Sequence, residues 1–176
     1  MALAILSKQF GDFNIFRANL QKELESKASF PYWLQISPTV YRLPDHLRFD
    51  FPSLTFLFEC GRSDVVEKLF LAETKYHDLR MILERNSDAC EERDQILAKA
   101  GFGSFALADL PKAEVVVGSA LKAKCENLNI FLQSRAERDG IEYQLAGESL
   151  QQLMNKIFGA KKVIKFKSML ARDSIN

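Results

Sequence analysis

The chain has little of the side-chain chemistry on which metal sites, disulfide frameworks and catalytic centres depend. It contains three cysteines (Cys60, Cys90 and Cys125) and two histidines (His46 and His77). A zinc site needs three or four such ligands at matched spacing, and here no Cys or His lies within a few residues of another. An odd number of distant cysteines also argues against a disulfide framework and favours a reducing compartment. We therefore expect no metal, no cofactor and a cytoplasmic protein.

Long apolar runs are also missing. The longest is far shorter than the roughly 20 residues that a membrane-spanning helix needs, so we expect no membrane span. The first eight residues have no basic leader and too little apolar length for a secretory signal, and we expect them to begin a helix. The 176 residues fit one domain of ordinary globular composition. We predict a single helical domain over residues 1–176.

What the chain does have is a long seam of side chains with a helical period. From Val65 to Leu83, apolar residues recur at alternating steps of four and three, which keeps them on one side of a helix. This part predicts a helix face that packs on a core. The rhythm then continues over side chains that are mostly polar or small: Asn86, Cys90, Arg93, Leu97 and Ala100.

A second long helix is predicted after the glycine-rich break at residues 101–103. Pro111 suits the first turn of a helix, and the helical pattern then extends to about residue 139. A short return of this kind makes two helices antiparallel neighbours. The predicted fold class is therefore mainly α: an antiparallel helical bundle with a long, coiled-coil-like helical hairpin (about 64–100 and 111–139). Further helices are expected over residues 3–27, 53–60 and 141–158.

Residues 29–52 cannot form one continuous helix. Four prolines interrupt them, and each lacks a backbone donor and restricts the residue before it. Eight of the 19 aromatic residues lie between Phe30 and Phe58. We expect an irregular, proline-rich strap with its rings in the core. Extended-type runs at residues 32–36, 39–43 and 162–167 leave room for a small β element.

The motifs that resemble catalytic or binding sites are incomplete. Residues 101–104 (Gly-Phe-Gly-Ser) lack the preceding strand, the third glycine and the Lys-Ser/Thr ending of a phosphate-binding loop, so a helix–helix turn is the better interpretation. Residues 87–94 include four carboxylates, which on a helix usually form a solvated face. A cysteine–histidine pair that meets only in space stays an open alternative. With no convergent group of titratable residues visible, we expect a non-catalytic protein.

The polar half of the seam gives the leading functional hypothesis. Residues 86–100 have too few apolar side chains for a conventional core, so we expect this half of the helix to be exposed. Polar seam positions often set register or partner choice. The candidate interaction surface is Asn86, Cys90, Arg93 and Leu97. The predicted function is a non-catalytic protein–protein interaction or assembly module that self-associates through helical surfaces.

The alternative function comes from the distribution of charge. Residues 1–155 carry 18 of the 24 basic side chains and 22 of the 23 acidic ones, a balance of −4, whereas residues 156–172 carry six basic side chains and no acidic one. Lysines interleaved with phenylalanine can bind phosphates and stack on bases. The tail 160–176 would then make an accessory nucleic-acid-binding protein, and an acidic protein surface would fit the same pattern. The candidate phosphate contacts are Lys161, Lys162, Lys165, Lys167 and Arg172.

Overall fold

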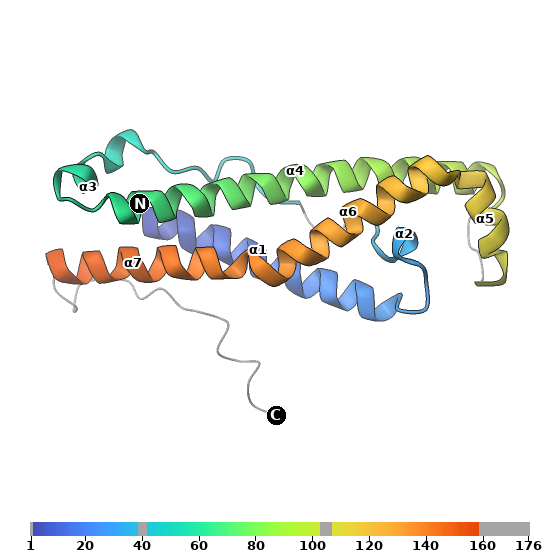
Figure 1. Cartoon of the computed structure of the whole chain (residues 1–176), viewed down its shortest axis with the longest axis horizontal. Helices are drawn as coiled ribbons and strands as arrows, with labels where there is room; N and C mark the ends of the chain where they lie inside the picture. The colour runs from blue at the N-terminus through green and yellow to red at the C-terminus, as the bar shows by residue number, and fades with distance from the viewer. Residues whose placement is uncertain (1, 39–41, 103–106, 159–176) are drawn as a thin grey trace, which may run out of the picture. The chain divides into compact units, whose positions relative to one another are not determined.

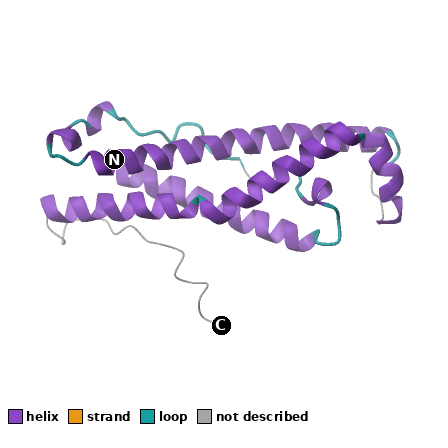
Figure 2. Cartoon of the chain, in the orientation of Figure 1, coloured by secondary structure: helices purple, strands orange, loops and turns teal. Residues whose placement is uncertain are grey.

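The computed structural model describes residues 2–38, 42–102 and 107–158, and the regular structure in this part of the chain is helical. Short 3-10 turns occur at Pro52–Leu54 and Leu107–Asp109. No strand occurs among the described residues (Figure 2), so the mainly α class is confirmed. In chain order (Figure 1) the α-helices are α1 (Ala2–Ser26), α2 (Tyr32–Gln35), α3 (Phe56–Glu59), α4 (Ser63–Lys99), α5 (Leu110–Val117), α6 (Ser119–Arg138) and α7 (Gly140–Phe158).

The predicted β element is not found in the described part of the strap. The run at residues 32–36, expected to be extended, instead forms the short helix α2, with Trp33 and Leu34 buried. Pro31 directly precedes this helix, where a missing N–H costs nothing because the first turn has no intrahelical acceptor for it. Of the candidate run 39–43, residues 39–41 lie outside the described residues and residues 42–43 form no strand, while the run 162–167 lies wholly outside them.

The long helices begin and end close to where the sequence predicts. The bounds of α1, α4 and α7 differ by one residue or less from the predicted 3–27, 64–100 and 141–158. The prediction of one continuous helix over 111–139 is wrong, because Gly118 separates α5 from α6. Its φ of 80° lies in the left-handed region, which glycine adopts without strain and residues with a Cβ rarely do.

The chain divides into two compact units, each built from segments that are distant in sequence. Unit 1 comprises Met1–Ile15, Leu43–Asp78 and Glu137–Asn176, which include α3, α7 and the first parts of α1 and α4. Unit 2 comprises Phe16–Arg42 and Leu79–Ala136, which include α2, α5, nearly all of α6 and the remaining parts of α1 and α4.

Aromatic rings form the centre of unit 1. Tyr143 of α7 lies against Phe10 and Phe13 of α1, with ring centroids 6.0 and 5.3 Å apart. These are distances at which tilted rings attract one another beyond the burial of their area. Tyr76 of α4 is also fully buried, and its hydroxyl group is 3.2 Å from Oδ2 of Asp12 on α1. The buried phenol is thus paired with a carboxylate rather than left without a partner.

Two side-chain hydrogen bonds fix the end of the strap within unit 1. Nε2 of Gln9 donates to the carbonyl oxygen of Leu47 at 2.8 Å, and the backbone N–H of Phe49 donates to Oε1 of Glu73 at 2.8 Å. Phe49 is buried as expected, but Tyr32 of the strap is exposed, as are Phe56 and Phe58 just beyond it. The expectation that the strap places its rings in the core is therefore only partly correct.

Candidate functional site

The polar half of the α4 seam faces the interior of unit 2. The exposed fractions are 2% for Asn86, 0% for Cys90, 3% for Arg93 and 3% for Leu97. This corrects the expectation that this half of the helix is exposed. A role for these four side chains in contacting a partner would require unit 2 to open. For Cys90 and Arg93, the burial reflects hydrogen bonds to the short helix α2 and to Ile36, which directly follows it.

Arg93 provides hydrogen-bond donors to the buried end of α2. Its Nη1 donates to the carbonyl oxygen of Trp33 at 2.6 Å and, at 3.4 Å, to that of Ile36. Its Nε donates to Oδ1 of Asp94 at 2.7 Å. A helix of four residues leaves its last carbonyl groups without an intrahelical donor. The guanidinium group therefore replaces donors that the next helical turn would have supplied.

Two further side chains donate to the same segment. The Cys90 thiol donates to the carbonyl oxygen of Ile36 at 3.4 Å, and Nδ2 of Asn129, on α6, donates to the carbonyl oxygen of Tyr32. Together with Arg93, they satisfy backbone acceptors at both ends of α2. The three side chains Cys90, Arg93 and Asn129 are called the α2 clamp below. The polar seam positions Cys90 and Arg93 thus have a partner inside the chain, namely the backbone of α2 and of Ile36.

Sequence reasoning missed the part of α6 that completes this arrangement. Cys125, Asn129, Leu132 and Ala136 are all buried and follow the steps four, three and four. The α4 positions Asn86, Cys90, Arg93 and Leu97 follow the same steps. This shared spacing is the sequence signal that could have identified the buried face of α6. The apolar side chains of Leu128 and Phe131 lie on a neighbouring stripe of α6 and are less buried.

Cys90 and Cys125 lie side by side in unit 2. The Cys125 thiol donates to the carbonyl oxygen of Ala89 at 3.6 Å, and both cysteines are free and buried. The interaction with the Cys125 thiol raises the pKa of Cys90, and burial raises it further. When Cys125 ionises, its sulfur accepts a hydrogen bond from the Cys90 thiol, which lowers the pKa of Cys125 to about 7. The positive charges of Arg93 and Lys124 act in the same direction, and burial acts against them. Of the two, Cys125 is therefore the thiol that ionises first.

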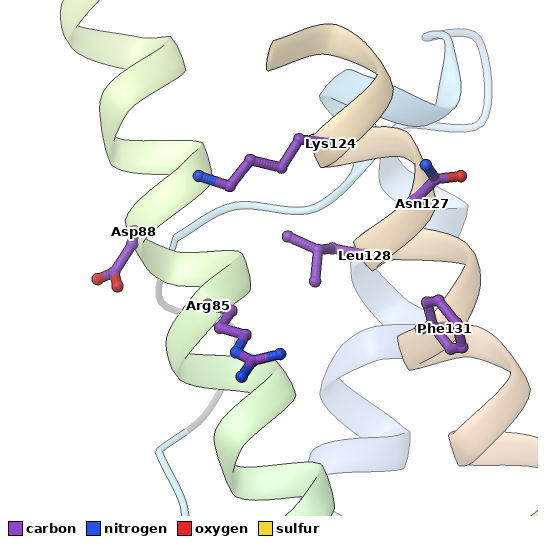
Figure 3. A pocket seen from close by; sticks show the side chains of 6 residues that line it. All are labelled: Arg85, Asp88, Lys124, Asn127, Leu128 and Phe131. Atoms are coloured by element: carbon purple, nitrogen blue, oxygen red, sulfur yellow. The ribbon is translucent and has the colours of Figure 1, made fainter. Parts of the chain in front are cut away.

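The outer side of unit 2 has a hollow of about 350 Å³ between α4 and α6. Figure 3 shows Lys124 and Leu128 reaching from α6 toward α4 across this hollow. The Lys124 ammonium also lies 3.7 Å from Oε2 of Glu92. Phe131 is 59% exposed at the same place. The residues that line the hollow are Arg85, Asp88, Lys124, Asn127, Leu128 and Phe131. Its apolar side chains are thus bordered by charges of both signs.

The carboxylates of residues 87–94 do not converge on one site. Glu91 accepts from Ser87 at 3.3 Å, Glu92 faces Lys124, and Asp94 pairs with Arg93. No group of three or more His, Cys, Asp or Glu side chains that could bind a metal ion occurs within residues 2–38, 42–102 and 107–158. Across the same ranges, no helix has the length and apolar content needed to cross a membrane.

The candidate phosphate contacts Lys161, Lys162, Lys165, Lys167 and Arg172 lie outside the described residues. The chain matches no protein-family model, no curated protein and no solved structure. A function must therefore be argued from the surfaces and buried groups of the chain itself.

Proposed function

We propose that the protein is a non-catalytic protein–protein interaction module that self-associates through the outer surface of unit 2. The observation that supports this most is the hollow between α4 and α6, where Leu128 and the exposed ring of Phe131 lie among charged side chains. Interfaces are commonly organised in this way, with an aromatic anchor at the centre and a polar rim. The helical hairpin of α4 and α6, which we propose to be antiparallel, would provide a rigid base.

The charges around the hollow favour a second copy of the chain as the partner. Arg85 and Lys124 are positive and Asp88 is negative, so the same patch on two molecules could pair opposite charges across a two-fold axis. The whole chain has a formal net charge of only +1, so two copies would repel each other little.

Replacing Phe131 by lysine is expected to prevent self-association. An exposed aromatic anchor would be removed and a charge would be placed in the interface, which should weaken the dimer at least roughly tenfold. The measurement is the molar mass by light scattering over a series of protein concentrations. A suitable control is Ile141→Lys on α7. Ile141 is 60% exposed and belongs to unit 1, whereas the hollow belongs to unit 2.

The wild type and the Ile141→Lys variant should both show a mass that rises toward that of a dimer, while Phe131→Lys stays monomeric. A wild type that is monomeric at every concentration would contradict self-association. Equal loss of association in both variants would show that the interface is not centred on α6.

The asymmetry of charge supports a second candidate function, binding of nucleic acid by the basic tail. We expect fluorescence anisotropy to detect binding of single- or double-stranded oligonucleotides at low salt, weakening steeply as salt is raised. Changing Lys161 and Lys162 to glutamine should make the salt dependence shallower, by about one unit of slope for each phosphate that the tail no longer neutralises. No binding at low salt would eliminate this candidate.

A further inference from the structure

The two thiols of unit 2 have no part in the proposed interaction surface. Cys90 on α4 and Cys125 on α6 are each 0% exposed, although neither belongs to a disulfide. The Cys125 sulfur lies 3.6 Å from the carbonyl oxygen of Ala89, the residue next to Cys90, and the two thiols are near enough to shift each other's pKa. A disulfide would require the two sulfur atoms, on neighbouring helices of the same unit, to approach to about 2.05 Å.

We infer that Cys90 and Cys125 are a redox modification site, which a peroxide converts into a reversible disulfide that links α4 to α6. The inference rests on the position of two thiols on neighbouring helices. It does not depend on self-association of the chain, and the two can fail separately.

The groups around the pair favour a reactive thiolate at Cys125. The nucleophile in thiol oxidation is the thiolate, and nearby positive charge stabilises it. Arg93 on α4 and Lys124 on α6 supply that charge, opposed by Asp94, which is itself paired with Arg93. Because the pKa of Cys125 is lowered, its thiolate forms more readily at neutral pH than that of an ordinary cysteine.

The α2 clamp can accommodate this ionisation. A thiol carries one proton, so Cys90 donates either to the carbonyl oxygen of Ile36 or to the ionised sulfur of Cys125. When it turns to Cys125, Nη1 of Arg93 still lies 3.4 Å from the Ile36 oxygen. The buried carbonyl therefore keeps a donor in the thiolate state.

The chemistry of the step is balanced by the peroxide alone. The Cys125 thiolate attacks one peroxide oxygen and breaks the O–O bond, which gives a sulfenic acid and a hydroxide that becomes water on protonation. Cys90 then gives up its proton and attacks the sulfenic sulfur, forming the S–S bond and releasing a second water. In total two thiols and one hydrogen peroxide give one disulfide and two waters.

Oxidation should also stabilise unit 2. The bond closes a loop of roughly 35 residues, and a loop of that size is expected to raise the midpoint of thermal unfolding by about 5–10 °C if the disulfide forms without strain. Because both thiols are buried, the reaction must wait for α2 to move aside, so it should be slower than oxidation of the exposed thiol Cys60.

The test uses the full chain with Cys60→Ser, which removes the exposed thiol and leaves the buried pair intact. After treatment with hydrogen peroxide, the intact mass should fall by two hydrogen atoms. Digestion without reductant should yield one peptide pair joined through Cys90 and Cys125. Dithiothreitol should restore the original mass and the lower unfolding midpoint.

Two matched variants assign the roles of the thiols. With Cys90→Ser added, the sulfenic acid at Cys125 should persist and be captured by a sulfenic-acid reagent, since no thiol remains to resolve it. With Cys125→Ser added, Cys90 should stay reduced under the same treatment. Circular dichroism confirms that each variant is folded. An unchanged mass in the Cys60→Ser protein, or added oxygen without the cross-linked peptide, would overturn the inference.

Discussion

Replacing Arg93 by methionine is expected to lower the free energy of unfolding by about 3 kcal/mol. Methionine keeps most of the apolar stem but removes the donors, so the carbonyl oxygen of Trp33 loses its 2.6 Å hydrogen bond inside unit 2. Each buried carbonyl left without a partner costs about 1–3 kcal/mol. The Ile36 oxygen is affected less, because Cys90 still donates to it.

A buried charge can often be exchanged for an apolar side chain at no cost when its partners are exchanged as well. Such a paired exchange is impossible for Arg93, because its partners are backbone carbonyl groups that no substitution removes. Asp94 would also lose its partner, but it is about half exposed and water can replace the interaction.

Urea unfolding measures this effect. Arg93→Lys serves as a graded comparison, since it keeps a charged donor but not the planar fork, and its loss of stability should be smaller. Arg48→Met in unit 1 removes an ion pair whose two side chains are 63% and 62% exposed, and it should change stability by less than about 0.5 kcal/mol. Equal stabilities of Arg93→Met and wild type would mean that α2 does not depend on this guanidinium.

The long helices could be predicted because local signals define them. The apolar rhythm from Val65 to Leu83 is periodic over several turns, and its side chains are indeed buried. Gly61 ends the segment before α4 with a φ of 67°, and Gly118 interrupts the second long helix in the same way. The break at Gly118 was missed because a single glycine within a helical pattern is often tolerated.

The environment of the polar seam could not be predicted from side-chain type alone. The period continues correctly through Asn86, Cys90 and Arg93, but polarity at these positions does not mean exposure. Cys90 and Arg93 are buried because the backbone of α2 and of Ile36 accepts hydrogen bonds from them, and a helix of four residues is too short to leave a periodic signal. A polar residue at a seam position can thus indicate that a backbone carbonyl group lies opposite it.

The same requirement explains the orientation of α6. Asn129 must face inward to reach the Tyr32 carbonyl group, and Cys125 lies on the same stripe. Turning that stripe inward leaves Leu128 and Phe131 at the outer hollow. The surface proposed for self-association is therefore a consequence of the buried polar contacts. The sequence alone did not distinguish between the two stripes.

Protection of the buried thiols is the second large effect expected. A maleimide should react quickly with the exposed Cys60 of the native protein. Cys90 and Cys125 can react only when unit 2 opens, so their rates should be at least about 1,000-fold lower, which corresponds to an opening free energy of roughly 4 kcal/mol. Arg93→Met should raise the labelling rates of Cys90 and Cys125 toward that of Cys60, because it weakens the attachment of α2.

Timed alkylation of the native wild-type chain, followed by mass spectrometry, is the most direct test of whether the polar half of α4 is buried against α2. We predict one rapidly added label, located at Cys60, and three labels only after denaturation. Labelling of Cys90 as fast as Cys60 under native conditions would contradict the burial of this half of the helix.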